Sequence, residues 1–534
     1  MKRFLKNTLY VSTAVISLTM YSCDALDLEP IDYYGDGNYW QREEHVIAYM
    51  DGIHKNLRDA TFQHLYVLGE ARGGTSKQGT AVDGTSLNYG GIIAQKLNAQ
   101  NSGINKFGEM YGRIANINIF LQKTKEANYM PEQNKTYYLA QAYGLRAFYY
   151  FDLYRTYGTV PLRLDPNEVV NGNFNPEQLY KGRASGKEVM QQIKNDLIES
   201  LRLFGDNLSF DPNNRDNLKS YWSKAATEYL AAEVYLWNAK VSVDNNPADE
   251  KDLTVAEQHC NNLLNNYNLS LMEDYSQIFD IEHKGNKEII LAIRCKEGEA
   301  GNFGPSFNYN YQTGNWKTVG YKDENGKLMG DTLQIRTSAM QRIEYLPEFF
   351  FAYEKGKDSR RDVNFLSAWH KENMSFQGTV FKKVMGHLNT STNQYIWDAD
   401  MVMYRLAGVY FMLAEIENMK GGDVAKYINP IRQRAYGKHY TEKVSYKNGT
   451  FTQNELAILA EKDKEMLGEG QRWFDVNRMT ITKGGDHLVF CKEGSKDGQR
   501  PLLNKATEAY KVFWPIETEM LNKDPEMTQT PGYE

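Results

Sequence analysis

One segment of the chain sets aromatic rings among side-chain amides, a pattern suited to sugar binding. Residues 302–316 (NFGPSFNYNYQTGNW) contain Tyr309, Tyr311 and Trp316, each with an asparagine or glutamine beside it. A sugar ring has apolar faces and a hydroxyl edge, so its site needs aromatic surfaces flanked by hydrogen-bonding groups. The alternation fits a β-strand with one buried face equally well, so both interpretations stay open for these three candidate ligand-binding residues. Weaker candidates of the same aromatic type are Trp369, Tyr395 and Trp397.

The motifs of common enzyme chemistry are missing from the sequence. It contains no HExxH, no GxSxG and no phosphate-binding loop, and GEGQRW at 468–473 follows a helical pattern, unlike a dinucleotide fingerprint. A glycosidase needs two carboxylates ~5–10 Å apart across a sugar. Nothing among the 68 acidic residues singles out such a pair. We therefore expect a binding protein and not an enzyme, with no catalytic residue and no cofactor.

Metal ions and nucleic acids are not expected as ligands. His45, His54 and His64 are spaced so that a helix would scatter them around its surface, which does not indicate zinc. No loop has the ligand spacing of a calcium site. The chain has 62 Lys and Arg against 68 Asp and Glu, a net charge of −6, and no basic block. The electrostatic footprint of a nucleic-acid-binding protein is therefore missing.

The first 22 residues have the organisation of an export signal. Basic residues precede an apolar run at 9–20, and Ser22 stands directly before Cys23. The run is too short for a transmembrane helix, which needs ~20 apolar residues. Residues 20–23 resemble a bacterial lipobox, whose cysteine becomes the acylated first residue of the mature protein. We expect lipidation at Cys23 and membrane attachment through this lipid anchor, with plain export as the alternative.

The body of the chain is patterned as pairs of helices. Small and large apolar residues recur at helical spacing along about 219–240, 135–157 and 404–414. The expected partner helices are, respectively, about 255–266, 186–204 and 423–435, and a further pair is about 41–67 with 103–126. Such pairs resemble tetratricopeptide units, although the strict ~34-residue period of those repeats is missing. We predict a mostly α-helical fold of degenerate tetratricopeptide-like helix pairs.

Long insertions rich in Gly, Asn and Tyr interrupt the helical pattern. They lie at 69–102, 158–184, 296–334 and 355–398. Insertions of this length are usually functional or disordered. Residues 287–294 (KEIILAIR) have the character of a β-strand, so a small mixed α/β region is expected between the helical halves. The predicted organisation is a signal peptide at 1–22, an N-terminal helical-repeat region at 23–286 and a C-terminal region at 287–534.

Segments along nearly the whole chain resemble the SusD/RagB family of Bacteroidetes outer-membrane lipoproteins. The C-terminal segments are RLAGVYFMLAEIENMKGG (405–422), INPIRQRAYG (428–437), EKDKEMLGEGQRWFDVNRM (461–479) and FWPIETEMLNKDPEMTQTPGY (513–533). The N-terminal segments are CDALDLEP (23–30), AYGLRAFYYFDLYRTYGTVPL (142–162) and KAATEYLAAEVYLWNAK (224–240). The joint occurrence of these segments is specific evidence for the resemblance, whereas any one helix alone would be weak evidence. The sequence departs from the family pattern at Gly408, where glutamate is favoured, and at Glu517, where proline is favoured.

The resemblance implies a surface glycan-binding lipoprotein that sits as a hinged lid over a TonB-dependent, SusC-like transporter and passes oligosaccharides to it. It implies a place at the outer membrane, facing the cell exterior. Within residues 71–91 it implies that Arg72, Asp83 and Tyr89 belong to the ligand-binding surface. Two alternatives remain: a peptide-binding lid of the RagB kind, and a helical-repeat scaffold that holds other proteins.

The best-matched motif of the resemblance is EGQRWFD at 469–475. Charged residues and a tryptophan on one short helix more often complete buried ion pairs than bind a ligand. We therefore predict a structural role for Glu469, Arg472, Trp473 and Asp475.

Overall fold

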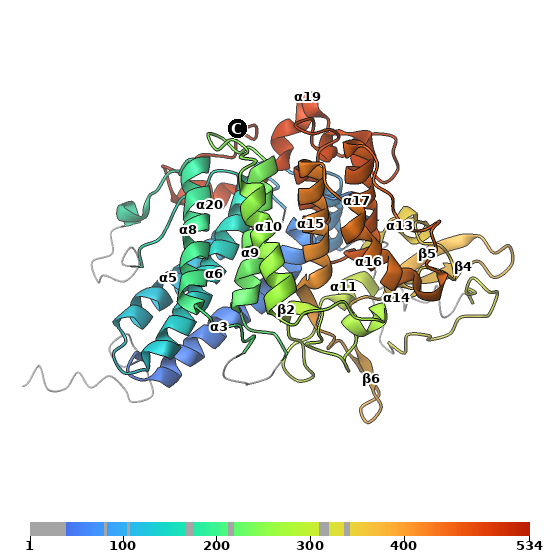
Figure 1. Ribbon diagram of the computed structural model, residues 1–534, viewed down its shortest axis with the longest axis horizontal. Helices are drawn as coiled ribbons and strands as arrows, with labels where there is room; N and C mark the ends of the chain where they lie inside the picture. The colour runs from blue at the N-terminus through green and yellow to red at the C-terminus, as the bar shows by residue number, and fades with distance from the viewer. Residues whose placement is uncertain are drawn as a thin grey trace, which may run out of the picture.

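Long helices dominate the computed structural model, and several of them stand side by side in the body of the molecule (Figure 1). The structure describes residues 39–79, 83–103, 107–166, 176–211, 218–308, 320–335 and 342–534. Its long helices are α3 (Glu43–Phe62), α5 (Phe107–Glu126), α6 (Glu132–Tyr157), α8 (Gly186–Phe204), α9 (Lys224–Lys240), α10 (Asp252–Asn266), α15 (Leu406–Lys420), α16 (Ala425–Tyr436) and α17 (Phe451–Glu465). In the described ranges, no helix combines the length and the hydropathy that crossing a bilayer requires.

The helix pairs expected from the sequence are pairs that pack in the structure. Helix α6 packs on α8, α9 on α10, α15 on α16 and α3 on α5, which confirms the prediction of degenerate tetratricopeptide-like pairs. Helices α9 and α10 also contact α15, and one large apolar core contains side chains from both halves of the chain. The division at 286/287 remains a prediction.

Capping side chains set where two of these helices begin. The Ser223 hydroxyl accepts a hydrogen bond from the Ala226 amide at 3.3 Å, so α9 begins at Lys224, later than its apolar stripe alone predicts. Ser185 and Glu188 form a reciprocal capping box at the start of α8. Both helices therefore carry their own start signal in the local sequence.

Shorter elements fill the long insertions and the two ends of the helical body. The short helices are the π-helix η1 (Gln63–Leu68), α4 (Gly84–Ile93), α11 (Gly304–Asn308), α13 (Pro347–Phe351), α14 (Arg360–Asn364), α18 (Arg472–Arg478), α19 (Lys505–Glu508) and α20 (Thr518–Lys523). The 3-10 turns are η2 (Pro176–Leu179), η3 (Tyr275–Ile278), η5 (Gly437–His439), η6 (Leu488–Phe490), η7 (Lys492–Gly494) and η8 (Ala509–Val512).

The strands form four small antiparallel pairs. Strand β2 (Ile289–Ile293), which confirms the strand predicted at 287–294, pairs with β8 (Met401–Arg405), and both are buried along their whole length. The other pairs are β1 (Ser76–Gln78) with β3 (Ile343–Tyr345), β4 (Phe365–Trp369) with β5 (Phe376–Phe381), and β6 (His387–Asn389) with β7 (Gln394–Ile396). The insertion at 355–398 is thus largely structured, and its hairpin β4–β5 lies at the right edge of Figure 1.

Charges buried away from solvent hold the C-terminal half together. Arg405, at the end of β8, has no exposed area and donates hydrogen bonds of 2.7 Å to Glu288, Glu465 and Glu469. Arg434 of α16 pairs with two of the same carboxylates, Glu288 and Glu465. Burial raises the pKa of Glu465, but the surrounding guanidinium groups outweigh it and bring that pKa well below its usual value. The cluster therefore remains ionised and joins β2, β8, α16 and α17.

The structural role predicted for the EGQRWFD motif is confirmed. Glu469 accepts hydrogen bonds from Arg405 in the buried cluster. Arg472 pairs with Asp463 at 2.7 Å and Asp475 pairs with Lys462 at 2.6 Å, and all four of these side chains are almost fully buried. Helix α18 is thus fixed to α17 by ion pairs.

Gly470 of this motif and Gly69 allow a close approach between distant segments. A Cβ atom on Gly69 would lie 1.9 Å from the carbonyl oxygen of Gly470, so both backbones need glycine there. The Trp473 amide donates to the Gly69 carbonyl at 2.8 Å. The Trp473 ring also lies 4.2 Å from the guanidinium carbon of Arg72. Both glycines in GEGQRW therefore serve packing, because a Cβ atom on Gly468 would likewise lie 2.5 Å from the ring of Phe381.

Both departures from the family pattern have a local explanation. A Cβ atom on Gly408 would lie 2.0 Å from the hydroxyl oxygen of Tyr229, so glycine leaves room for this buried ring, which stacks on Tyr404 at 4.3 Å. Glu517 accepts a hydrogen bond from the Phe107 amide, the first of α5, at 3.2 Å. A carboxylate is favourable there because the N-terminus of a helix carries unpaired N–H groups and partial positive charge.

The buried cluster predicts a large loss of stability when its central cation is removed. Arg405→Ala would leave carboxylates buried without their shared partner, and breaking a buried ion pair costs ~3–5 kcal/mol. We expect a much lower midpoint in guanidinium unfolding followed by circular dichroism. Lys447→Ala is the matched control, because its pair with Glu442 is more than 70% exposed and such pairs contribute only ~0–1 kcal/mol. Equal midpoints for the two variants would contradict the role given to the cluster.

Candidate functional site

Helix α3 carries polar and apolar residues on different sides. Its polar stripe has the i, i+3, i+4, i+7 spacing of one helix face and consists of Asp51, His54, Lys55 and Arg58. Its buried residues fall between them and include Met50, Ile53 and Leu57. The helix therefore turns its apolar stripe to the core and its polar stripe away from it.

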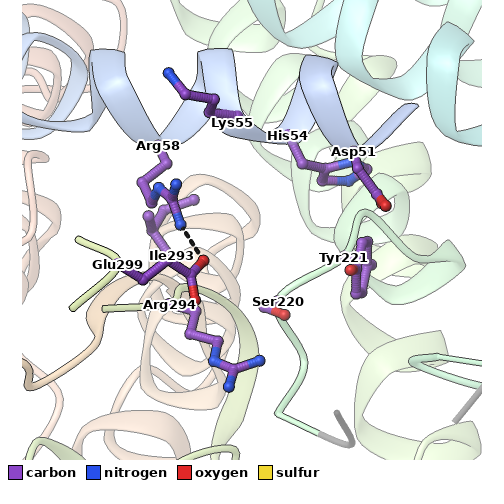
Figure 2. Close-up of a pocket in the computed structure, with 9 residues that line it drawn as sticks. All are labelled: Asp51, His54, Lys55, Arg58, Ser220, Tyr221, Ile293, Arg294 and Glu299. Atoms are coloured by element: carbon purple, nitrogen blue, oxygen red, sulfur yellow. Dashed lines mark hydrogen bonds and ion pairs between the residues drawn. The ribbon is translucent and has the colours of Figure 1, made fainter. Parts of the chain in front are cut away.

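The polar stripe of α3 forms one wall of a pocket of about 280 Å³ (Figure 2). The opposite wall comes from two segments, Ser220 and Tyr221 before α9, and Ile293, Arg294 and Glu299 after β2. This volume lies near the lower end of the ~300–1,000 Å³ range of small-molecule pockets. The pocket therefore has room for a small polar ring and not for a large ligand.

His54 connects helix α3 to the segment before α9 through a hydrogen bond, and its imidazole ring is neutral. Its Nε2 accepts a hydrogen bond from the Trp222 amide at 3.0 Å, so that nitrogen carries no proton. Its Nδ1 then carries the proton and donates it to the Met50 carbonyl at 3.0 Å. The ring also meets Tyr221 edge-on, with centroids 5.1 Å apart. Because both nitrogens are engaged, His54 holds the Tyr221 segment in position.

An ion pair closes the other end of the pocket. Arg58 of α3 donates to Glu299 at 2.7 Å, and Figure 2 shows the guanidinium directed at that carboxylate. This hydrogen bond holds the pKa of Glu299 below its usual value. Both side chains are partly exposed, so the pair orients the turn after β2 and adds little stability.

An aromatic cluster continues the face beyond the ion pair. Phe62 lies one helical turn after Arg58, with its ring centroid 5.3 Å from that of Phe303 and 5.8 Å from that of Tyr89. Phe303 leads directly into α11, after which the chain enters residues 309–319, outside the described residues. Phe62 therefore links helix α3 to Phe303 and Tyr89 through ring contacts.

The structure places the three predicted residues of segment 71–91 in different surroundings. Tyr89 is only 7% exposed, and burial raises the pKa of its hydroxyl. Asp83 lies nearer the surface in an ion pair with Arg342 at 2.8 Å. Arg72 is 1% exposed, its guanidinium lies over the rings of Trp473 and Trp514, and burial lowers its pKa to about 10.

None of these three residues lines the pocket beside α3. A ligand-binding role for Arg72, Asp83 and Tyr89 therefore remains a prediction. The other predicted positions, Tyr309, Tyr311, Trp316 and the lipidation site Cys23, lie outside the described residues.

The sequence did not single out the residues that line the pocket. The polar spacing from Asp51 to Arg58 was visible, but any solvated helix face shows the same spacing. The second wall, with Tyr221 and Glu299, comes from segments remote in sequence, and only the folded chain brings them to α3. In the described part of the chain, no group of His, Cys, Asp and Glu residues is arranged to hold a metal ion.

Comparison with known proteins gives consistent matches over most of the chain. Residues 355–533 match the SusD family, and residues 72–236 match a family described as "Starch-binding associating with outer membrane". The crystal structure of a SusD superfamily protein from Bacteroides fragilis NCTC 9343 is similar, with 45% identity, a TM-score of 0.86, and coverage of 93% of this chain and 100% of that one.

Two further relatives match over similar lengths. B. fragilis NanU has 29% identity and a TM-score of 0.79, covering 95% of this chain and 100% of its own. SusD-like protein P38 of Formosa agariphila is 24% identical over 510 residues, which are 90% of this chain and 92% of that protein.

The different surroundings of Tyr89 and Asp83 predict different effects on stability. Tyr89→Ala removes a buried ring, and loss of a buried aromatic side chain costs ~3–5 kcal/mol. Asp83→Ala removes one partner of a partly exposed ion pair, worth ~0–1 kcal/mol. Calorimetry should give a clearly lower Tm for Tyr89→Ala and an almost unchanged Tm for Asp83→Ala. A fall of the same size in both variants would show that the packing around Tyr89 has been misjudged.

Proposed function

This chain belongs to the SusD family, and from that membership we propose that it binds glycans at the outer membrane and delivers them to a partner TonB-dependent transporter. The observation that carries glycan binding is the pocket beside α3, because its lining mixes donors, acceptors and a ring in a small volume. The family description matched by residues 72–236 supports both starch-type ligands and outer-membrane association.

The chemistry of the pocket suits a ligand rich in hydroxyl groups. Each sugar hydroxyl can donate one hydrogen bond and accept others. Asp51 and Glu299 supply charged acceptors, while Arg58 and Arg294 supply charged donors. Hydrogen bonds to charged groups are the stronger kind. The Tyr221 ring adds an apolar surface for the face of a sugar, and the predicted residues Tyr309, Tyr311 and Trp316 would add more.

Binding without catalysis is the role that the pocket supports. Hydrolysis of a glycosidic bond needs a carboxylic acid whose pKa is raised, so that it can donate a proton near neutral pH. Glu299 has the opposite property, because the hydrogen bond from Arg58 holds its pKa below the usual value. An ionised Glu299 can accept hydrogen bonds from a sugar but cannot protonate a leaving group.

Two substitutions and one control test glycan binding. After a glycan array has identified a ligand, Tyr221→Ala and Trp316→Ala should each weaken its affinity about thirtyfold in calorimetry, the effect of ~2 kcal/mol expected for a central aromatic contact. Tyr440→Ala, a partly buried tyrosine after α16, is the matched control and should bind normally. Wild-type affinity in Tyr221→Ala would rule out the pocket as the site, wild-type affinity in Trp316→Ala would remove Trp316 from it, and binding of peptides in place of glycans would favour a RagB-like function.

The lipid anchor is tested separately. Cys23→Ala should abolish incorporation of labelled palmitate and release the protein from the membrane fraction, because Cys23 is the only acceptor that the lipobox offers. Cys491→Ala, at a partly exposed cysteine of the folded body, should remain lipidated. Continued labelling of Cys23→Ala would show that the anchor lies elsewhere.

A further inference from the structure

A second pocket, of about 570 Å³, lies where three segments remote in sequence meet. Its walls come from residues within 72–95, 346–348 and 495–508, and none of these residues lines the pocket beside α3. The volume falls within the ~300–1,000 Å³ range of small-molecule pockets. We call this space the Arg72 pocket, after the buried cation in its wall.

Arg72 differs from every other buried arginine of the described chain because it has no carboxylate partner. It is 1% exposed and forms no ion pair with a described residue. Each of the other buried arginines, Arg405 among them, forms an ion pair of 2.6 or 2.7 Å with Asp or Glu. A buried charge without a counter-ion is costly. An anion is therefore favourable in the pocket that Arg72 lines.

Only neutral groups hold the Arg72 guanidinium in place. Its Nε donates to the side-chain oxygen of Gln95 at 2.6 Å, and its Nη2 donates to the Lys511 carbonyl. The rings of Trp473 and Trp514 lie 4.2 and 5.4 Å from the guanidinium carbon, and they attract the cation without supplying a negative charge. Its Nη1 is buried and has no hydrogen-bond partner among the described residues.

Gln95 fixes the guanidinium at the wall of the pocket. Its side-chain nitrogen donates to the Arg72 carbonyl at 3.0 Å, so the two residues are joined by hydrogen bonds in both directions. The backbone of Gln95 is in the left-handed region, with a φ of 58°, which is uncommon for a residue other than glycine. Since both residues line the pocket, the position of the cation is set before any ligand arrives.

The carboxylates in the wall of the pocket do not neutralise Arg72. Glu508 pairs with Lys511 at 2.8 Å. Glu348 and Asp497 are exposed to water, which weakens their effect on a charge in the pocket. An anion that enters the pocket therefore meets a cation that is already out of water and has no counter-ion.

We propose that the Arg72 pocket binds an anionic sugar, such as a uronic acid, with its carboxylate beside the Arg72 guanidinium. The carboxylate supplies the missing counter-ion, and the attraction is strong because burial lowers the local dielectric constant. Amide and hydroxyl side chains of the same wall, Gln95, Ser495 and Asn504, suit the hydroxyl groups of a sugar ring. Arg72 alone selects the anionic group, whereas the choice of a sugar as its carrier rests on the proposed function.

Calorimetry with glucuronate and with glucose, its neutral counterpart, tests this inference. The wild-type protein should bind glucuronate about tenfold more tightly than glucose, and added salt should reduce the difference. Arg72→Gln should abolish the preference and Arg72→Lys should retain part of it, because only the lysine variant keeps the charge. Circular dichroism checks that both variants fold.

A second variant decides the matter if the substitutions at Arg72 prevent folding. Arg500 is an exposed cation in the wall of the same pocket, so Arg500→Gln should reduce the preference for glucuronate about two- to threefold and leave the fold intact. Arg202→Gln is the matched control, because Arg202 is also an exposed arginine but lies on α8 and does not line the pocket.

The outcomes separate this inference from the proposed function. It is wrong, and the proposed function stands, if the wild-type protein binds an array glycan but does not prefer glucuronate to glucose. It is equally wrong if a folded Arg72→Gln, or Arg500→Gln where Arg72→Gln does not fold, keeps the full preference, or if Tyr221→Ala loses it. Acetate that binds as tightly as glucuronate would contradict the assignment to a sugar. An Arg72-dependent preference in a protein that binds no array glycan would support the Arg72 pocket and contradict the proposed function.

Discussion

The cost of removing charge from water constrains the whole C-terminal half of this protein. Arg405 has no exposed area, so carboxylates must surround it, and these come from Glu288, Glu465 and Glu469 in separate parts of the chain. A buried ion pair gives little net stability against an apolar replacement, but loss of one partner is expensive. The requirement that every partner be present therefore fixes how these segments meet.

Strand β2 connects this buried charge cluster to the proposed site. Arg405 lies opposite Ile289 in the β2–β8 pair, next to Glu288 of the charge cluster. The far end of β2 supplies Ile293 to the pocket, and the turn after it supplies Glu299. Strand β2 thus carries part of one wall of the site up to α3, while Ser220 and Tyr221 lie on the connecting segment before α9, and binding residues often lie on such connections.

Local sequence signals were sufficient to predict the helices and the buried ion pairs. Apolar spacing predicted the paired helices, and the EGQRWFD motif predicted buried ion pairs. Tertiary partners decided the rest: the chain stays extended through Arg405 because β8 pairs with β2, although the apolar stripe predicts a helix from about 404. The resemblance placed Tyr89 and Arg72 on the binding surface, a role that remains a prediction, but their contacts with Phe62 and Trp473, which are remote in sequence, could be found only in the fold. The pocket was missed for the same reason, since its two walls meet only in the fold.

The most direct test of glycan binding at the α3 pocket is hydrogen exchange measured by mass spectrometry with and without the glycan. Bound ligand should slow exchange in residues 51–58, 218–222 and 293–303, which surround the pocket, and should leave the slow exchange of α17 and α18 unchanged. Protection that appears only outside these three segments, under conditions where the glycan is bound, would contradict the account.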